Sequence, residues 1–273
     1  MADAKFELRG WENTDLKVDD KTNIIEVLGL LWDRKRDLLF CNVTEIARPP
    51  DPITRRKILS TAQKIFDPIG FLCPVTLYPK LLLQESWKTK LSWDAEVPED
   101  IKLKFLKWLS ALSKLKDIKI PRCIQLHEES VVLSLHTFCD ASQHSYAAVV
   151  YLRSEVGEKT YIQLVQAKAR VAPLKKVTIP RLELLACCIG VRLALGVAKS
   201  LNIPNVSQYF WTDSSTALTW IKKDAKWGAF VENRVKEIRS TTNVKDWRHI
   251  SGALNSADLP SRGCSVQTLL TSN

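Results

Sequence analysis

The sequence predicts a mixed α/β domain, with a mixed sheet flanked by helices, preceded by a smaller α+β part. Three strand-like runs follow one another from about residue 130. Helix-like and strand-like runs then alternate as far as about residue 260. Before Pro121, by contrast, a short region of alternating apolar and polar residues gives way to amphipathic, helix-like segments. The change in pattern predicts two structural units in one chain.

The first unit begins with two apolar and polar alternations, at residues 23–33 and 37–43, which predict strands around a charged turn. Thr54 is placed to cap a helix that runs to about residue 66. Its expected apolar face holds Ile58, Leu59, Ala62, Ile65 and Phe66, and its polar face holds Arg55, Arg56, Lys57 and Lys64. A turn at residues 67–70 ends this helix, and helical spacing recurs at 75–87 and 101–115.

In the second unit, residues 131–139, 146–153 and 161–170 predict three strands. A long helix at 181–201 and a strand at 207–212 follow. Helices are then expected at 214–222 and 227–240, a strand at 244–250, and a short helix near residue 258. Three antiparallel strands followed by alternating helices and strands form the element order of the ribonuclease H fold.

Composition narrows the class of protein. The chain has 273 residues, of which 45% are hydrophobic, so it can form one large or two ordinary cores. Its net charge is +10, and the basic residues are spread along the chain, which suits a phosphate-facing surface. Residues 2–9 are too polar for a secretory segment, and the apolar run at 184–198 is too short to cross a bilayer. The seven scattered cysteines predict buried free thiols, and an intracellular chain without a membrane partner is expected.

Four acidic residues have settings that predict a metal site: Asp140, Glu183, Asp213 and Asp258. Asp140 and Asp213 lie at the ends of predicted strands, while Glu183 and Asp258 lie in or at the start of predicted helices. Four carboxylates at one edge of a sheet are tolerable only beside bound cations, and Mg²⁺, with Mn²⁺ as an alternative, prefers oxygen ligands. Two such ions can serve both ends of a phosphodiester displacement, with Asp140 bridging them.

Structural alternatives exist for each acid. Asp213 could cap the helix that follows it, and Asp258 could cap the last one. Glu183 lies among leucines, where a carboxylate is costly unless it is paired or metal-bound, and Arg181 or Arg192 could supply an ordinary partner. As an ordered set on the expected elements, however, the four residues favour a nuclease-type site.

Other polar and aromatic residues could each have either a functional or a purely structural role. His249 is expected on the last strand or just beyond it, where it could shuttle protons or lie on the surface. Asn255 could bind a ligand or its own loop. Lysines alternate with Trp227 and Trp247 in a way that suits a sugar-phosphate backbone. Tryptophans are more often core residues than surfaces for ligand stacking, and this is expected of Trp211, Trp220 and Trp247. Two more lysines, Lys175 and Lys176, could contact a nucleic-acid backbone or lie in a solvated loop.

Several motifs resemble the Bel/Pao class of long-terminal-repeat retrotransposon polyproteins over nearly the whole chain. They lie at residues 167–175, 178–184, 211–214, 230–235 and 255–263. The resemblance implies that residues 130–265 are a ribonuclease H domain that degrades RNA in RNA:DNA hybrids during reverse transcription. Two departures stand out: no glycine follows Asp140, and the spacing from His249 to Asp258 is shorter than in many cellular ribonucleases H.

The same resemblance divides the rest of the chain. Residues 1–50, including 6–11 and 28–32, look like the end of a reverse-transcriptase palm with primer-grip strands, and 51–129 looks like the thumb and connection; 266–273 would be a tail. The polymerase Tyr-x-Asp-Asp element is absent, and Asp19-Asp20 is interpreted as a solvated turn, so this fragment is not expected to polymerise.

Two alternatives remain open at this point. Such regions carry the name of a Pao-type peptidase, but an aspartic peptidase normally has Asp-Thr-Gly or Asp-Ser-Gly turns, and neither Asp140 nor Asp213 is followed by that glycine. The other is an idle nucleic-acid-binding remnant. Expected partners are an RNA:DNA hybrid and the polymerase palm and integrase of the same polyprotein, in a cytoplasmic retrotransposon particle or the nucleus.

Overall fold

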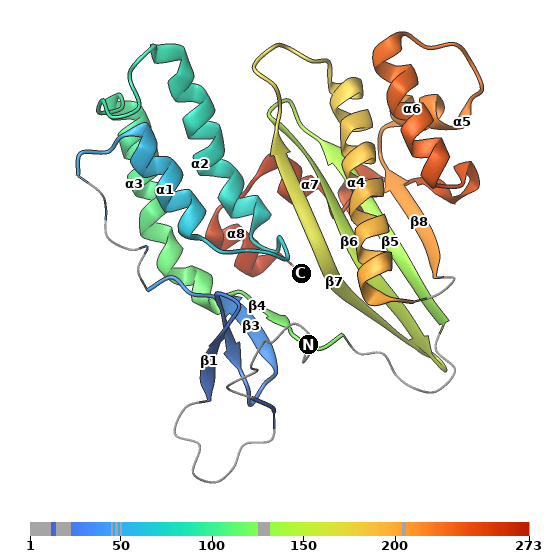
Figure 1. Cartoon of the computed structure of the whole chain (residues 1–273), viewed down its shortest axis with the longest axis horizontal. Helices are drawn as coiled ribbons and strands as arrows, with labels where there is room; N and C mark the ends of the chain where they lie inside the picture. The colour runs from blue at the N-terminus through green and yellow to red at the C-terminus, as the bar shows by residue number, and fades with distance from the viewer. Residues whose placement is uncertain are drawn as a thin grey trace, which may run out of the picture.

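The computed structural model describes residues 12–14, 23–44, 46, 49, 51–124, 132–203 and 206–272. Three sequence predictions lie outside these residues: the strand at 6–11, the turn at Asp19-Asp20, and the boundary between 129 and 130. Within the described residues the chain forms two sheets and two sets of helices, which Figure 1 shows side by side.

The N-terminal sheet has the antiparallel order β1-β2-β3-β4, formed by Ile24–Val27, Leu30–Asp33, Leu38–Cys41 and Lys119–Pro121. The single strand predicted over 23–33 is wrong, because Leu28 and Gly29 have positive φ angles of 49° and 80° and reverse the chain into a hairpin. The charged turn predicted before residue 37 is confirmed. Strand β4 was not predicted, since three residues are too few to show an alternation.

Helices α1 (Arg55–Lys64), α2 (Cys73–Ser86) and α3 (Glu99–Ala111) form the first helical set. The predicted Thr54 cap is confirmed, because its side chain accepts a hydrogen bond from the Lys57 N–H. The predicted faces of α1 were partly wrong: Leu59 and Phe66 are exposed, whereas Arg55 is buried and donates to the Ser86 hydroxyl. Short 3₁₀ turns at Trp87–Thr89 and Leu112–Asp117 extend α2 and α3.

The second sheet has the order β7-β6-β5-β8-β9. Its strands are β5 (Val132–Ala141), β6 (Ser145–Val156), β7 (Lys159–Val171), β8 (Ser207–Thr212) and β9 (Trp247–His249). Strands β5, β6 and β7 pair antiparallel, whereas β8 runs parallel to β5 and β9 parallel to β8. The predicted strand 244–250 is shorter than expected, because Val244–Asp246 forms a 3₁₀ turn.

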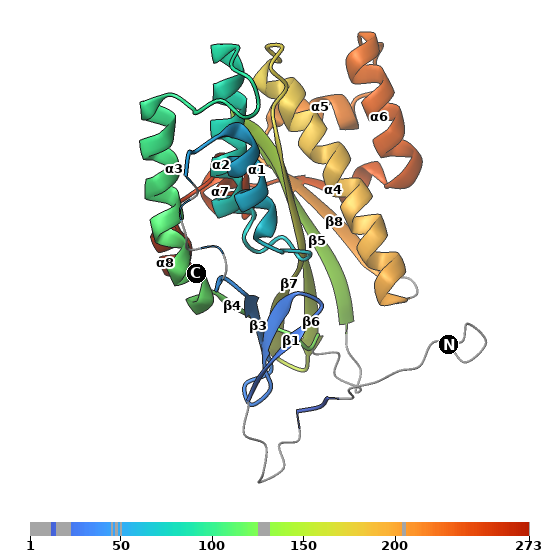
Figure 2. The same ribbon diagram turned by 60° about the vertical axis from the view of Figure 1, so that its left-hand side comes forward.

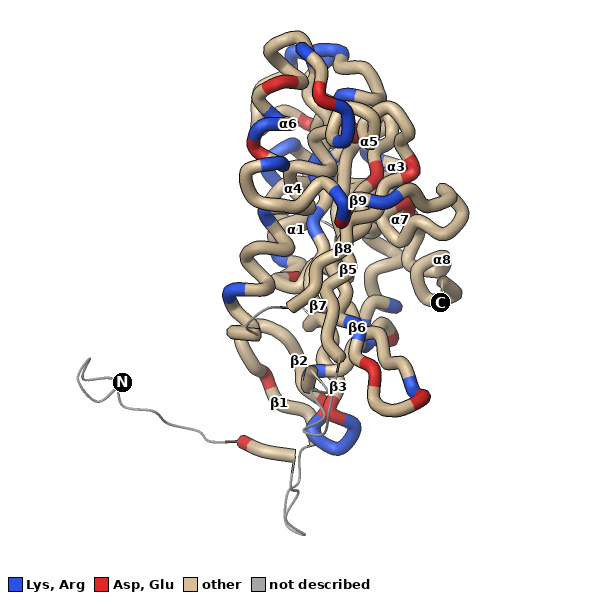
Figure 3. Tube along the Cα trace, turned by 90° about the vertical axis from the view of Figure 1, so that its right-hand side faces the viewer, with Lys and Arg blue, Asp and Glu red and all other residues tan. Residues whose placement is uncertain are grey.

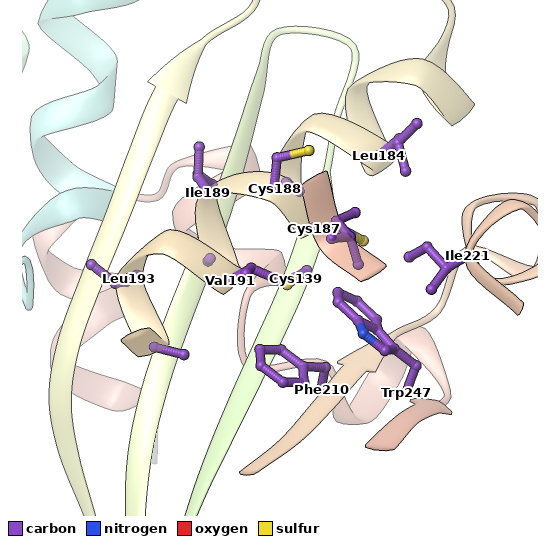
Figure 4. Packing of buried hydrophobic residues seen from close by; sticks show 14 of the residues in the cluster. Cys139, Leu184, Cys187, Cys188, Ile189, Val191, Leu193, Phe210, Ile221 and Trp247 are labelled. Carbon is purple, nitrogen blue, oxygen red and sulfur yellow. The ribbon is translucent and has the colours of Figure 1, made fainter. Parts of the chain in front are cut away.

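Helix α4 (Ile179–Leu201) lies on one face of this sheet, with α5 (Ser215–Lys222) and α6 (Ala229–Thr241) beside it (Figure 1). Their shared core includes Cys139, Cys187, Phe210 and Trp247, with the last two rings stacked 4.8 Å apart between centroids (Figure 4). The apolar segment is longer than the run predicted at 184–198, because α4 has 23 residues. The prediction that it is too short to cross a bilayer is therefore wrong: by length and composition α4 could cross a membrane, with a mean hydropathy of 1.8. However, 56% of its most apolar window is buried in the structure, so packing against the sheet accounts for its apolar character.

All seven cysteines are free. Burial of these thiols is confirmed for Cys41, Cys139, Cys187 and Cys188, whereas Cys73 and Cys264 are partly exposed and Cys123 is exposed.

The two units are joined at the edge strand β7. The backbone N–H of Ala167 donates to the Ile69 carbonyl at 2.7 Å, so the turn after α1 pairs with that edge. Gly70 has a φ of +91°, and a Cβ there would collide with the Ala167 carbonyl, so glycine suits the position. A second link is the Gln84 side-chain amide, which donates to the Ala172 carbonyl at 2.6 Å. Edge pairing of this kind also protects an exposed strand.

The end of the chain crosses back to the first unit. Helix α7 (Asp258–Arg262) lies against β5, β6 and β7, and α8 (Val266–Thr271) packs with α2 and with the 3₁₀ turn that follows α3; Figure 2 shows both helices. Between the two helices, the Cys264 N–H donates to the Pro74 carbonyl at 3.1 Å. Residues 266–272 are therefore not the expected irregular tail, because Val266 is buried in the helical core of the first unit.

Candidate active site

Three carboxylates meet at the edge of the second sheet. Asp140 is the last residue but one of strand β5, and Asp213 directly follows β8. These strands are parallel and place Cys139 opposite Thr212, so the two aspartates come to the same edge. Glu183 joins them from the second turn of α4, which packs on β5 and β6. Each residue has an oxygen that lies within 4.8 Å of the others.

The environment of the three acids disfavours negative charge. Asp140 is 3% exposed, and burial raises its pKa to about 6 despite a hydrogen bond from the Ser261 hydroxyl. Burial, together with the charges of Asp140 and Asp213, raises the pKa of Glu183 to about 9. One oxygen of Glu183 accepts the Ala141 N–H, and the other, Oε2, is buried without a partner among the described residues.

A buried, unpartnered carboxylate oxygen beside two more carboxylates is satisfied by a proton or by a cation. The donor set consists of oxygens alone, which is the chemistry that Mg²⁺ and Mn²⁺ prefer. The residues present therefore fit a divalent metal ion.

The structural alternatives for these acids do not hold. Ser214, and not Asp213, caps α5, because its side chain accepts from the Ala217 N–H. The N-cap of α7 is Ala257, which has no side-chain capping bond, so Asp258 is not a cap. Neither proposed partner of Glu183 pairs with it: Arg192 binds Glu237 at 2.6 Å, and Arg181 lies over the Phe230 ring.

Asp258 begins the last short helix of the domain, as predicted, but its carboxylate is outside the group of three. It accepts a hydrogen bond from Arg262 Nε at 2.5 Å. Asp258 is still close enough for its charge to help raise the pKa of Asp140. The structure therefore brings three of the four predicted ligands together and places the fourth beside them.

His249 and Asn255 both contact Asp213. His249 ends β9 opposite Thr212, and its Nε2 lies 3.2 Å from the Asp213 carbonyl oxygen on an exposed surface. Asn255 is buried, and its amide donates to the Cys139 carbonyl at 3.0 Å and to Asp213 Oδ1 at 3.3 Å. Of its two predicted roles, Asn255 binds its own loop, through the Ala257 N–H, and also positions an acidic residue of the site.

Sequence reasoning missed two residues of the site. Ser261 donates to Asp140 and lies one turn after Asp258, a spacing that places both on one side of a helix. Gly252 lies against Asp213, where a Cβ would approach Oδ2 to 2.9 Å. The Ser261 signal was present in the motif at 255–263, whereas nothing in the sequence around Gly252 indicates the contact.

The aromatic and basic residues divide between core and surface. Trp247 is fully buried, whereas Trp211 and Trp220 are half-buried. The lysines at 222, 223 and 226 are exposed, as are Lys175 and Lys176. Figure 3 shows Lys and Arg positions spread along the length of the molecule, from the β2–β3 turn to the α5–α6 end, as the sequence indicated.

A family comparison identifies the chain. A sequence model described as "Pao retrotransposon-like RNaseH-like domain" matches residues 54–214, more than half of the chain. The chain belongs to this Pao family. The matched region contains Asp140, Glu183 and Asp213 and also the helices α1 to α3, so it includes parts of both structural units.

Several solved structures are similar to this Pao-family chain. The foamy viral protease-reverse transcriptase bound to double-stranded DNA is 12% identical, with a TM-score of 0.50 over 84% of this chain and 37% of that one. Ribonuclease H1 from Halobacterium salinarum is 12% identical, with a TM-score of 0.30 over 46% and 89%. LC11-RNase H1 in complex with an RNA/DNA hybrid is 10% identical, with a TM-score of 0.32 over 45% and 88%. No curated protein matches.

The family match, the strand order and the foamy viral structure confirm the predicted ribonuclease H-like mixed sheet, and the family match confirms the retrotransposon family. The five-stranded order, with three antiparallel strands followed by two parallel ones, is the arrangement that the element order predicted.

Proposed function

We propose that this Pao-family chain is a metal-dependent ribonuclease H that cuts the RNA strand of RNA:DNA hybrids by phosphodiester hydrolysis. The observation that carries the proposal is the cluster of Asp140, Glu183 and Asp213 oxygens within 4.8 Å, with one Glu183 oxygen buried and unpartnered. A carboxylate in that setting is charged at neutral pH only when a cation compensates it.

Asp140, Glu183 and Asp213 would hold Mg²⁺ or Mn²⁺, with Asp258 completing the set at the rim. When bound, such ions lower the pKa of water and stabilise the leaving oxygen of a phosphodiester. Asn255 holds the Asp213 carboxylate in place, and Ser261 orients Asp140. His249 is exposed at the same edge, where its ring can take up or release a proton near the substrate.

Specificity for a hybrid would come from backbone shape and the 2′-hydroxyl, so little sequence preference is expected. The polymerase palm, the integrase of the polyprotein, and a cytoplasmic particle or the nucleus are the partners and location that this function implies.

The test is cleavage of a hybrid labelled on each strand in turn. The purified chain is incubated with Mg²⁺ or with EDTA, beside Asp140→Asn and Asp213→Asn. Glu158→Gln, in the exposed β6–β7 turn, is the matched control for loss of one charge. Cuts in the RNA strand that disappear with EDTA and in both aspartate variants, but not in the control, would support the proposal. Cleavage retained in both aspartate variants would reject the site.

A further inference from the structure

Two neighbouring cavities form one groove between the helices of the first unit and the end of the second. The first, of about 480 Å³, lies between α2, α3 and the residues that follow α7. The second, of about 390 Å³, lies between α2 and the turn after β5. They share Tyr78, Leu81 and Lys104, so they are continuous. We name this the α2–α7 groove; its polar and aromatic lining includes Tyr78, Lys88, Lys104, Lys107 and Arg262.

The groove lies beside the end of helix α7 and the turn after β5. Arg262 lines its first half and binds Asp258, while the neighbouring Ser261 binds Asp140. At the other end the groove is lined by His144, in the turn that directly follows β5. The groove therefore borders the end of helix α7, the helix that provides Asp258 and the buried Ser261. Figure 2 shows α7 next to α2 in this region.

The charge of the groove favours an anion. Four cationic side chains line it, against one carboxylate, Glu85. Lys104 is compensated, because it pairs with Glu85 at 3.1 Å and with Asp100 at 3.7 Å. Lys88 and Lys107 are exposed and have no ion pair within the part of the chain that the structure describes. Two uncompensated lysines along one groove suit successive phosphates.

The floor of the groove is apolar and rigid. Trp108 is buried, and its ring N–H donates to the Val75 carbonyl at 3.1 Å, which fixes the ring between α3 and α2. Tyr78 is 38% exposed and presents an aromatic surface in both halves. Sugars of a nucleic acid pack on such surfaces while basic side chains hold the phosphates.

We propose that the α2–α7 groove holds the sugar-phosphate backbone of the nucleic-acid substrate next to the cleavage site. This rests on the proposed function for the identity of the substrate. It assigns the first helical unit a role in substrate binding, through Lys88 of the α2 end and Lys107 of α3. Contacts to the backbone would position the substrate without reading its sequence.

The test measures binding apart from cleavage. In the Asp140→Asn chain, Lys88→Gln and Lys107→Gln are combined, and the Kd for a short RNA:DNA hybrid is measured at several salt concentrations. The control combines Lys35→Gln and Lys159→Gln, two exposed lysines in the β2–β3 turn and at the start of β7, which removes the same charge away from the groove. The slope of log Kd against log salt should fall by about 2 in the groove double and stay unchanged in the control, since each phosphate contact contributes about 1.

Each outcome decides the proposal. Equal slopes and affinities in the two double variants would overturn it, and so would an Asp140→Asn chain that shows no salt-dependent binding of the hybrid. The chain with both Lys88→Gln and Lys107→Gln could also bind the hybrid as well as the control does but no longer bind polyglutamate. That result would assign the groove to an acidic protein and would overturn the proposal. Cleavage is measured separately in the chain that retains Asp140. If the chain cleaves the hybrid normally and the two lysine substitutions leave binding unchanged, only the groove proposal is rejected. If the substitutions reduce the salt slope but the chain never cleaves the hybrid, the proposed nuclease function is rejected and the groove proposal is supported.

Discussion

Replacing Glu183 with Gln should change how stability depends on pH in the metal-free protein. Burial and the neighbouring aspartates raise the pKa of Glu183 to about 9, from the ordinary 4.5 of a glutamate. Between these values the folded chain holds a proton that the unfolded chain has released, so the free energy of unfolding falls as pH rises. The group contributes no such loss below about pH 4.5.

The magnitude follows from the width of this pH window. One proton held only by the folded state lowers the free energy of unfolding by about 1.4 kcal/mol per pH unit. From pH 5 to pH 8 the loss from Glu183 would reach about 4 kcal/mol. This is an upper value, because part of the raised pKa comes from the charge of Asp140, whose own pKa is about 6. Glu183→Gln removes this loss, because the amide does not titrate.

Urea unfolding in EDTA at pH 5, 6, 7 and 8 tests this prediction. The wild-type chain should lose stability over this range faster than Glu183→Gln, while Glu158→Gln, on the exposed β6–β7 turn, should follow the wild type. Mg²⁺ at a hundred times its Kd should add about 2.7 kcal/mol to the wild type and much less to Glu183→Gln. Parallel pH curves for wild type and Glu183→Gln would refute the assignment of Glu183 as a buried acid that needs a cation.

Three further substitutions have distinct expected results. Asn255→Ala removes a buried amide bound to Asp213, so it should lower the free energy of unfolding by about 1 to 3 kcal/mol and slow hybrid cleavage, measured by urea unfolding and by rate. His249→Ala should lower the cleavage rate by roughly 100-fold with an unchanged Tm, because it removes an exposed ring placed to transfer protons; an unchanged rate would show that this ring has no part in cleavage. Gly70→Ala should cost about 1 to 3 kcal/mol, because φ is +91° and the added Cβ meets the Ala167 carbonyl; limited proteolysis between the two units should then become faster.

The second unit could be predicted well because its elements are long. Helix α4 and strand β8 lie within two residues of their predicted bounds, since apolar periodicity over many residues is a strong signal. Strand β4 was not predicted, and the strand that contains β9 was predicted too long, because three residues show almost no periodicity. The burial of Arg55 could not be predicted either, since it depends on Ser86, which is distant in sequence.

The sequence predicted the acidic residues of the candidate site but not the residues that hold them in place. The convergence of Asp140 and Asp213 follows from two strands that run parallel, so the pattern of elements predicted it. Ser261 lies in the motif at 255–263, but its contact with Asp140 spans more than 100 residues, and the contact of Gly252 with Asp213 spans about 40. Sequence reasoning could not identify the partner of either residue. The position of Asp258 outside the group of three depends on Arg262, four residues later, and i to i+4 ion pairs compete with more distant contacts on any helix.

The first helical unit helps to shape the candidate active site, because it anchors the end of helix α7. Helix α7 provides Asp258 and Ser261, and it has only five residues, so it is too short to be stable alone. Its end is fixed by the Cys264 N–H bond to the Pro74 carbonyl and by Val266, which is buried among the helices of the first unit. The hydrogen bond that orients Asp140 therefore depends on a helix anchored in the other unit. The helices of the first unit therefore help to shape the site, and the family match, which begins at residue 54, includes them.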